Sequence, residues 1–592
     1  MFPRRLVFFL MGASLWAAAP DGAALYKARC AVCHDGQAQP RMPLRDELAA
    51  KTPEFVFNAM VSGAMTVQAA GLSEDEGRAV ARFLTAKEFG STAAPAMTGQ
   101  CTAAAPKFSI ADGDWNGWGA DPGNSHYQSK PGLDAADVPK LKLKWAFGFP
   151  KDPMAWAQPT VVGGRVFVGS VAGNVYSLDA SSGCIYWTYS TGRGAGVRSA
   201  VTIGKLANGK WAAYFGDIKA NAFAVDAETG ALLWKVQLDD HPVARITGAP
   251  IFVNGRVYVP MSSIEEASAQ QKTYVCCTFR GSLSALDAST GKVLWKSYSV
   301  TDPPKAYHTG KEGTEMKGPA GAAIWSSPTV DLKRKVIYAA TGNSYTGVNI
   351  STSDSIIAYD LETGRLIWSS QVQPKDNFII GCPNHPNCPE ESGPDFDFGS
   401  SPVLRTLPNG KQIIVAGQKS GVVWGLDPDN RGKVLWQTRV GKGSALGGVE
   451  WGHAADDRYA YAAVSDRIVG KNGTPGLYAL DLMTGEQKWA TPGPAVGGNP
   501  AQSAAIAVIP GAVFSGALNG HFRAYSTTDG AIVWDFETNR KFDTVNGVDA
   551  KGGSIDAGGP AISHGMVYTN SGYGIFGGIA GNVLLAFSVD GK

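Results

Sequence analysis

The stretch AVDAETGALLW, residues 224–234, recurs along the chain and decides its fold. It joins two short β-runs through a turn that carries Asp226 and Gly230, and it ends in Trp234. An Asp side chain accepts hydrogen bonds from turn amides, and Gly supplies the positive φ that such turns require. Related copies end in six other tryptophans: Trp187, Trp295, Trp368, Trp436, Trp489 and Trp534. From about residue 109 the chain is therefore built from copies of one unit.

A second hairpin precedes each copy, as in PTVVGGRVFVGS at residues 159–170. Four short strands per repeat are typical of a propeller blade. LKLKWAF, residues 141–147, has the pattern of an outermost strand without partners before it, and NVLLAFSVDGK, residues 582–592, that of an inner strand without partners after it. Joined, they complete an eighth blade and leave no open edge. We therefore predict a mainly β protein with an eight-bladed propeller and an N-to-C clasp. A seven-bladed ring with a stray end is the alternative.

Composition and the first residues bound the class of protein. A net charge of +2 argues against nucleic acid as a partner, and 73 Gly, 16 Trp and 18% charged residues favour an all-β chain. Residues 1–19, MFPRRLVFFLMGASLWAAA, predict a signal peptide cleaved near Ala19, because the apolar stretch is short for a membrane anchor. We expect a periplasmic protein without a membrane span, in a compartment where disulfides form.

The motif CAVCH predicts a covalent haem c. Cys30 and Cys33 are spaced to bond to the haem vinyl groups, and His34 follows as an iron ligand. A structural zinc site would need a second ligand pair, and none follows at suitable spacing. For the sixth ligand we favour Met65, with Met60 or Met42 as alternatives. A His/Met haem has a raised potential, which suits accepting electrons.

The domain organisation follows from these motifs. Residues 20–88 are predicted to form a small helical cytochrome domain, whose last helix is capped by Ser73 with Glu76 three residues on. Residues 89–108, rich in Ala, Thr, Gly and Pro, are predicted to be a linker. Residues 109–592 form the propeller.

Six further cysteines remain for the propeller part of the chain. Cys382 and Cys388 bracket a short loop, and Cys101 and Cys184 are left over as a possible pair. Cys276 and Cys277 are adjacent in TYVCCTFRG, residues 273–281. Their Cα atoms would lie about 3.8 Å apart across a trans peptide, whereas ordinary disulfides span roughly 4.4–6.8 Å. Free thiols, two separate bridges and a strained ring remain open.

The repeats resemble those of the pyrroloquinoline quinone (PQQ) quinohaemoprotein alcohol dehydrogenases. DWNGWGADPGNSHYQS, residues 114–129, matches the entry segment of that family. The N-terminal haem motif and the TYVCCTFRG stretch are most similar to those family members that oxidise polyvinyl alcohol. The resemblance implies three cofactors: PQQ, haem c and Ca²⁺.

The resemblance also implies a site for the quinone and the cation. Trp325 in AAIWSSPTV forms one face of a flat slot, and a Cys276–Cys277 ring forms the other. Asn343 in the TGN motif and Glu266 ligate calcium, with Glu265 as the alternative for the acid. Carboxylate and amide oxygens suit this ion.

For the base, the resemblance points to Asp397 in GPDFDFGSSPVL, which also ligates calcium, with Asp395 as the alternative. We expect Phe396 and Phe398 to shield Asp397 from water and to raise its pKa. The contacts to the quinone oxygens come from residues of several blades: Lys419, Thr247, Arg198, Glu450 and Trp451. At the last two positions relatives often carry Asn-Trp, and Arg198 is offset by one residue from a family arginine.

The implied activity is oxidation of secondary alcohols, with polyvinyl alcohol as the candidate substrate. Asp397 removes the hydroxyl proton, and hydride moves to the quinone carbonyl that calcium polarises. Electrons then pass to the haem and on to an external cytochrome c or another acceptor. Two alternatives stay open: a dehydrogenase of the same family for small alcohols or sugars, and a non-catalytic propeller scaffold of the outer-membrane assembly type.

Overall fold

The computed structural model describes residues 19–35, 43–61, 65, 68–90, 98–192 and 194–592. It divides into two compact units, one of residues 1–57 with 71–92 and one of residues 58–70 with 93–592. Most of the predicted signal peptide, residues 1–18, and the candidate ligand Met42 lie outside the described residues. The predicted boundaries at residues 88 and 108 stay a prediction. Among the described residues, no helix has the length and apolarity to cross a bilayer.

The N-terminal part is helical, as the sequence predicted. Its helices are α1 (Gly22–Arg29), α2 (Ala31–His34), α3 (Arg45–Ala49), α4 (Pro53–Val61) and α5 (Glu74–Thr85). The predicted cap is confirmed, because Ser73 Oγ accepts from Glu76 N and Glu76 Oε2 accepts from Ser73 N. Helices α1 and α5 meet backbone to backbone: a Cβ on Gly22 would lie 2.1 Å from the carbonyl oxygen of Ala79.

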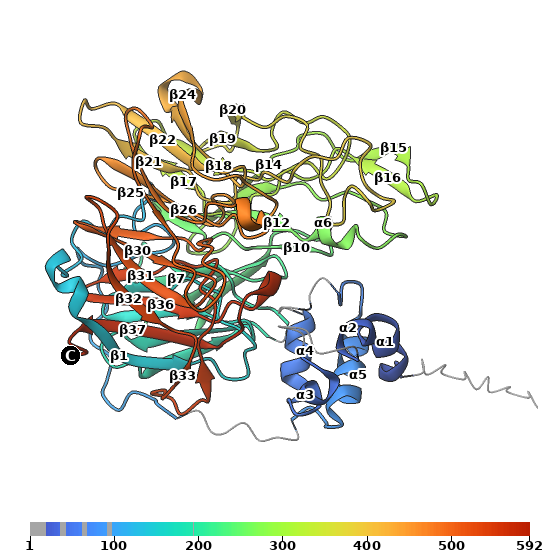
Figure 1. The fold of residues 1–592 in the computed structure, drawn as a ribbon, viewed down its shortest axis with the longest axis horizontal. Coiled ribbons are helices and arrows are strands. Elements are labelled where there is room, and N and C mark those ends of the chain that lie inside the picture. Colours follow the sequence, from blue (N-terminus) through green and yellow to red (C-terminus); the bar gives the residue numbers. More distant parts are fainter. Residues whose placement is uncertain (1–18, 36–42, 62–64, 66–67, 91–97, 193) are drawn as a thin grey trace, which may run out of the picture. The chain divides into compact units, whose positions relative to one another are not determined.

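The second unit is a propeller (Figure 1), and its described residues form eight antiparallel sheets of four or five strands, besides two short hairpins. The first two contain β2 (Thr160–Val162), β3 (Arg165–Gly169), β4 (Asn174–Asp179) and β5 (Ile185–Ser190), then β6 (Thr202–Lys205), β7 (Trp211–Gly216), β8 (Asn221–Asp226) and β9 (Leu232–Gln237). The third contains β10 (Ala244–Arg245), β11 (Ile251–Val253), β12 (Arg256–Ser263), β13 (Ser282–Asp287) and β14 (Val293–Tyr298), and the fourth β17 (Thr329–Asp331), β18 (Val336–Ala340), β19 (Ser355–Asp360) and β20 (Leu366–Gln371). The fifth and sixth contain β21 (Val403–Thr406), β22 (Gln412–Gly417), β23 (Val422–Asp427) and β24 (Lys433–Arg439), then β25 (Ala454–Ala455), β26 (Tyr459–Val464), β27 (Gly476–Asp481) and β28 (Gln487–Pro492). The seventh contains β29 (Ala507–Ile509), β30 (Ala512–Gly516), β31 (His521–Ser526) and β32 (Ile532–Glu537).

The eighth sheet confirms the predicted clasp. It contains β35 (Ala561–Ser563), β36 (Met566–Ser571) and β37 (Val583–Val589), with β1 (Leu141–Gly148) added at its outer edge. The pairing of β1 with β37 runs from Leu141 opposite Val589 to Gly148 opposite Val583. Figure 1 shows these strands, from opposite ends of the sequence, side by side. The ring therefore closes, and the seven-bladed alternative is excluded.

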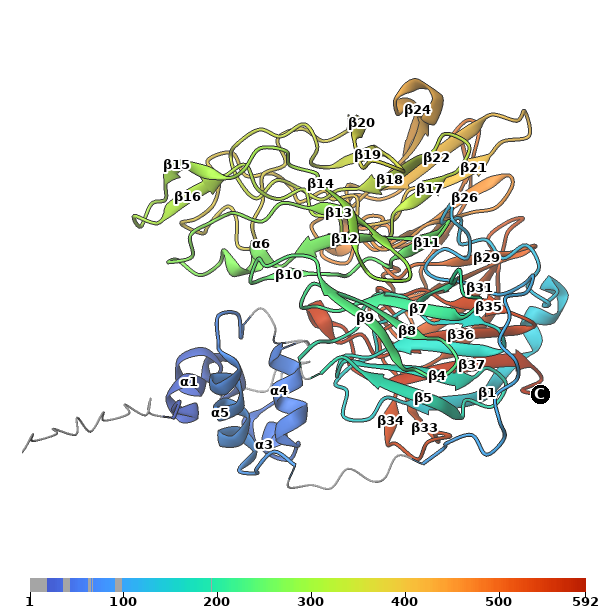
Figure 2. The ribbon, with the colours of Figure 1, turned by 180° about the vertical axis from the view of Figure 1, so that it is seen from behind.

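Several smaller elements lie outside the eight blade sheets (Figure 2). They are the helix α6 (Glu265–Ser268), the hairpins β15 (Lys305–Thr309) with β16 (Glu315–Gly318) and β33 (Lys541–Phe542) with β34 (Ala550–Lys551), and the 3₁₀ turns η1 (Ala135–Lys140), η2 (Pro428–Asn430), η3 (Gly470–Asn472) and η4 (Ile575–Gly577).

The repeat tryptophans pack between blades, as predicted. The indole Nε1 of Trp234 donates to Ala288 O at 2.9 Å in the next blade. Its ring lies against Gly291, where an added Cβ would be 2.8 Å from the indole. Gly291 has a φ of +72°, so the same glycine serves the turn and the contact. The pattern crosses the closure as well, because Trp534 Nε1 donates to Leu141 O at 2.9 Å.

Three disulfides connect the propeller cysteines. They are Cys101–Cys184, Cys382–Cys388 and Cys276–Cys277. The first anchors the chain that leads into the propeller, where Gln100 also forms a β-bridge with Ile185. For the adjacent cysteines the ring is the correct alternative, and the peptide bond between them is cis.

Candidate active site

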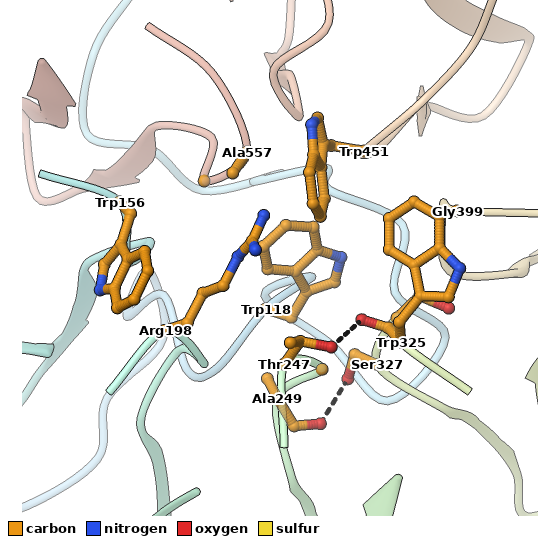
Figure 3. A pocket seen from close by; sticks show the side chains of 13 residues that line it. Trp118, Trp156, Arg198, Thr247, Ala249, Trp325, Ser327, Gly399, Trp451 and Ala557 are labelled. Carbon is orange, nitrogen blue, oxygen red and sulfur yellow. Dashed lines mark hydrogen bonds between the residues drawn. The ribbon is translucent and has the colours of Figure 1, made fainter. Parts of the chain in front are cut away.

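The pocket is built from equivalent positions of different blades. Its lining includes Trp156, Arg198, Thr247, Trp325, Gly399, Trp451 and Ala557. Each of these residues stands shortly before an inner strand, namely β2, β6, β11, β17, β21, β25 and β35 in that order. Figure 3 shows their side chains converging. The propeller repeat therefore places residues from seven of the eight blades around a common space, which suits a ligand contacted from several sides.

The entry segment crosses the inner strands and contributes to the same pocket. Trp115 N donates to Val161 O at 2.8 Å in β2, and Val508 N in β29 donates to His126 O at 2.8 Å. Bonds to β6, β17, β21 and β25 are made by the residues between them: Asn116, Pro122, Gly123 and Ser125. Trp118, in the middle of this segment, lines the pocket.

Trp325 is held in place by its backbone and by the space around its ring. Thr247 Oγ1 donates to Trp325 O at 3.0 Å. A Cβ on Gly399 would lie 2.1 Å from the Trp325 ring, so only glycine fits there. The ring of Trp451 meets it edge-on at 4.9 Å, at an interplanar angle of 81°. Trp325 thus presents a fixed flat surface beside the pocket.

A buried lysine joins the two candidate bases. Lys419 Nζ lies 3.1 Å from both Asp395 Oδ1 and Asp397 Oδ2. Burial lowers the pKa of Lys419, but the neighbouring acids outweigh burial and raise it well above its usual value. The pKa of Asp395 is also raised well above its usual value, by burial first and by the charges of Asp397 and Glu266 against the opposing Lys419. Lys419 therefore remains a cation, held between the two acids.

Asn343 and Asp397 lie in direct contact. The backbone N–H of Asn343 donates to Asp397 Oδ1 at 2.6 Å. The Asn343 amide nitrogen donates to Ser344 O and Phe378 O, each at 2.8 Å. Since both amide protons are used, the Oδ1 oxygen of Asn343 remains as an acceptor beside Asp397.

The two adjacent glutamates of α6 have different partners. Glu265 is fully buried and accepts from Thr278 N and Phe279 N, both at 2.8 Å, so its carboxylate fixes the loop after the paired cysteines. Glu266 has its pKa raised to about 7, chiefly by burial and then by the charges of Asp397 and Asp376. Glu266 therefore lies within electrostatic reach of Asp397.

The donor set of Glu266, Asn343 and Asp397 fits a divalent cation. Its carboxylates repel one another, and a cation among them would relieve that repulsion. Among the described residues, no three His, Cys, Asp or Glu side chains form a metal site alone, so an amide oxygen must complete the set. Oxygen donors from acids and an amide match calcium better than zinc.

Two further buried acids, Asp376 and Asp354, lie within electrostatic reach of the candidate bases, and Asp376 also holds their loop. Asp376 accepts from Asp395 N at 3.0 Å and from Phe396 N at 2.6 Å. Within the described part of the chain, neither carboxyl oxygen of Asp354 has a hydrogen-bond partner, and burial, followed by the charge of Asp376, raises its pKa well above the usual value. The sequence reasoning missed both acids, because neither lies in a motif.

Arg198 lies on the other side of the pocket. Its guanidinium stands 4.4 Å from the centre of the Trp451 ring, and its Nη2 donates to Tyr573 OH at 2.8 Å. Glu450, next to Trp451, is buried and carries an Oε2 atom without a hydrogen-bond partner.

The paired cysteines are fully buried in a hydrophobic cluster. Cys277 N donates to Lys317 O at 2.8 Å, which ties the ring to β16. Trp325 packs against the same cluster. The role of the ring as the second wall of the slot stays a prediction.

The haem motif keeps its donors available. Cys30 and Cys33 are unpaired in the structure, whereas the six other cysteines form disulfides. His34 is buried and its Nδ1 lies 2.7 Å from Pro43 O, which orients the ring and leaves Nε2 for a metal. Met60 and Met65 fall in the segment of residues 58–70, which groups with the second unit. The sixth ligand therefore stays a prediction.

Two further tryptophans of the pocket, Trp118 and Trp156, were not predicted from the sequence. A signal for Trp156 exists, because WAQPTV at residues 156–161 has the same pattern as WSSPTV at residues 325–330. Both tryptophans stand three residues before a proline that leads into an inner strand.

Comparison with known proteins agrees with this fold. The family described as glucose/ethanol/alcohol dehydrogenase, beta-propeller domain, of the PQQ type matches residues 115–439. The family described as cytochrome C oxidase, cbb3-type, subunit III matches residues 17–84. A shorter match, residues 419–551, is to the outer membrane protein assembly factor BamB family, which is similar to this part of the propeller. A quinohemoprotein alcohol dehydrogenase structure from Pseudomonas putida HK5 covers 81% of each chain with a TM-score of 0.61 at 18% identity, which shows the fold. These matches define a PQQ-type propeller with a cytochrome c-type domain.

Full-length relatives narrow the class. A polyvinylalcohol dehydrogenase from Pseudomonas sp is 46% identical over 97% of this chain and 94% of its own length. Another from Sphingopyxis sp. (strain 113P3) is 44% identical over 97% of this chain and 93% of its own length. The chain belongs to the polyvinyl alcohol dehydrogenase family of PQQ-dependent alcohol dehydrogenases.

Proposed function

We propose that the protein oxidises secondary alcohol groups of polyvinyl alcohol to ketones and passes the electrons through its own haem to an external acceptor. The observation that supports this most is the contact between Asp397 and Asn343, with Lys419 on the second oxygen of Asp397. An acid fixed on both sides beside a flat tryptophan is suited to take a proton from a bound alcohol.

Asp397 acts as the base. Its Oδ1 is fixed by Asn343 N–H and its Oδ2 by Lys419, so the carboxylate has one orientation. The proton of the substrate hydroxyl goes to a carboxylate oxygen of Asp397. PQQ, when bound on Trp325, supplies the hydride acceptor. Five residues would bind the quinone and orient it over that ring: Lys419, Thr247, Arg198, Glu450 and Trp451.

Glu266, Asn343 and Asp397 would hold calcium. The ion would supply a Lewis acid that polarises a carbonyl oxygen. When Glu266 binds the ion, the ion neutralises the negative charge of Glu266. The repulsion between Glu266 and Asp397 is then relieved. Glu265 has a different task, because it holds the loop that carries Cys276 and Cys277.

Cys30 and Cys33 would bind haem c covalently, and His34 would ligate its iron together with Met65. The haem supplies one-electron chemistry. Two unpaired thiols beside an oriented histidine, in a chain whose other cysteines are oxidised, support this assignment. An exported, periplasmic location agrees with the three disulfides.

The test compares substrates on one purified, PQQ- and calcium-loaded preparation. Haem reduction is followed by absorbance after addition of polyvinyl alcohol or of short secondary alcohols at equal hydroxyl concentration. The proposal expects the polymer to reduce the haem faster at low concentration. Faster reduction by the short alcohols would assign a small-alcohol dehydrogenase, and an oxidised haem with every alcohol would contradict the proposed activity.

A further inference from the structure

A buried carboxyl group without a hydrogen-bond partner among the described residues belongs to Glu450, which precedes the pocket-lining Trp451. Glu450 is 5% exposed, and its Oε2 has no partner among the described residues. Its backbone is fixed beside Trp325, because Glu450 O would lie 2.5 Å from a Cβ on Gly399, the glycine that accommodates the Trp325 ring. A polar group in this situation is stabilised by a partner that the described chain does not supply.

Most of the charged and titratable groups around Glu450 form hydrogen bonds or ion pairs with other residues. They are Asp556, Lys419, Arg467, Arg198 and Tyr573. Lys419 bonds to Asp395 and Asp397, Arg467 lies 3.3 Å from Asp556 Oδ2, and Arg198 bonds to Tyr573. Burial, followed by the charge of Asp556, raises the pKa of Glu450 to about 7 against the opposing cations. The pKa of Tyr573 is raised by burial, so this side chain is neutral.

The surroundings also locate the carboxyl group relative to the slot. Two of the cations that act on Glu450 lie against the aromatic walls of the pocket. Lys419 Nζ is 5.5 Å from the centre of the Trp325 ring, and Arg198 is 4.4 Å from that of Trp451. Glu450 therefore stands within electrostatic reach of whatever occupies the space between these rings.

We propose that Glu450 takes up a proton from solvent when the quinone binds, and that in its neutral form it donates a hydrogen bond to an oxygen of this anionic ligand. This inference rests on the proposed function. A carboxylate accepts hydrogen bonds only, whereas a carboxylic acid also donates one. A charged Glu450 would repel the carboxylates of the ligand, and protonation turns that repulsion into a bond.

The coupling between quinone binding and protonation of Glu450 predicts how the PQQ affinity changes with pH. The bound state prefers protonated Glu450, so binding is independent of pH where the free enzyme is already protonated. Above the pKa of about 7 the proton must be taken from solvent, and the affinity falls by up to about tenfold per pH unit. The ligand carboxylates have ordinary pKa values near 4 and do not titrate in this range.

The experiment is calorimetric titration of PQQ into calcium-saturated, quinone-free enzyme at pH 8, in two buffers with different ionisation enthalpies. We expect uptake of about one proton per PQQ. The variants Glu450→Gln and Glu450→Asn should bind PQQ without this uptake. Asp152→Asn is the matched control, because Asp152 is also buried with a pKa raised to about 7 by burial, and no pocket residue contributes to that shift. This control should take up the proton like the wild type.

The outcomes separate the inference from the proposed function. Binding without proton uptake in the wild type, or uptake that persists in Glu450→Gln, overturns the inference and leaves the dehydrogenase assignment intact. Absence of PQQ binding in every form contradicts the proposed function itself. If Glu450→Gln does not fold, the wild-type proton count and the Glu450→Asn variant still decide.

Discussion

The ammonium group of Lys419 lies 3.1 Å from Asp397 and at the same distance from Asp395. One cation therefore forms ion pairs with two acids that are two residues apart in sequence. The acids differ in every other contact: Asp397 accepts from Asn343 N–H, whereas the backbone of Asp395 is held by Asp376. This difference separates the base from its neighbour.

Replacing Asp397 with Asn should remove substrate-dependent haem reduction. The proton acceptor is lost while the side chain keeps its size, and loss of a general base costs at least about a hundredfold in rate. Stopped-flow absorbance of the reduced haem gives the rate, and reduction by dithionite shows that haem attachment is intact. Asp395→Asn is the comparison and should retain turnover. Unchanged turnover in Asp397→Asn would assign the base elsewhere.

The two glutamates of α6 should respond differently to the same substitution. Glu266→Gln should lower calcium affinity at least about tenfold, because a charged ligand is lost. Glu265→Gln should leave this affinity unchanged but lower the free energy of unfolding by about 2–3 kcal/mol, since two backbone N–H groups lose a charged acceptor. Calcium titration calorimetry and thermal unfolding measure the two effects. The reverse pattern would make Glu265 the ligand.

The Cys276–Cys277 ring should matter for binding of the quinone. In the double variant Cys276→Ala with Cys277→Ala, we expect PQQ affinity to fall about tenfold, because a flat buried contact of the slot is lost. Fluorescence titration with PQQ measures the affinity. The variant Cys382→Ala with Cys388→Ala removes another disulfide and should bind normally. Equal affinity in both variants would argue against the ring as a wall.

Asp152 should make stability depend on pH. Its pKa is raised to about 7 by burial, above the unfolded value of about 4, so the folded state loses stability as pH rises between these values. Asp152→Asn removes that loss, and its stability relative to the wild type should rise by up to about 4 kcal/mol from pH 4 to pH 7 and then level off. Thermal unfolding at matched scan rates follows this difference. A difference independent of pH would show that Asp152 ionises freely in the folded state.

The fold was predictable because its signals are local. Most repeats carry a turn Asp, a turn Gly and a terminal Trp, and these three residue types explain the hairpin and the contact with the next blade. The clasp was predictable because no strand precedes β1 to pair with it and no strand follows β37, so the last blade lacks its outermost strand until β1 is added.

The site was only partly predictable, because it is assembled from loops of many blades. The resemblance favoured Glu266 but left Glu265 as the alternative, since adjacent residues of a short helix differ only in the direction of their side chains. Asp354 and Asp376 carry no motif and matter only because the fold places them behind Asp395 and Asp397. Trp118 reaches the pocket through an entry segment whose path depends on hydrogen bonds to six blades.

The clasp also determines at which stage of folding the pocket forms. Leu141 pairs with Val589, almost at the end of the chain, and Trp534 docks on the same strand. Contacts between residues so far apart in sequence form late in folding, since a long loop must close first. A pocket that needs residues from Trp118 to Ala557 cannot be complete on a growing chain. Cofactor loading is therefore an event of the finished polypeptide, and a chain that lacks its last strand should lose the quinone site as well as the closure of the ring.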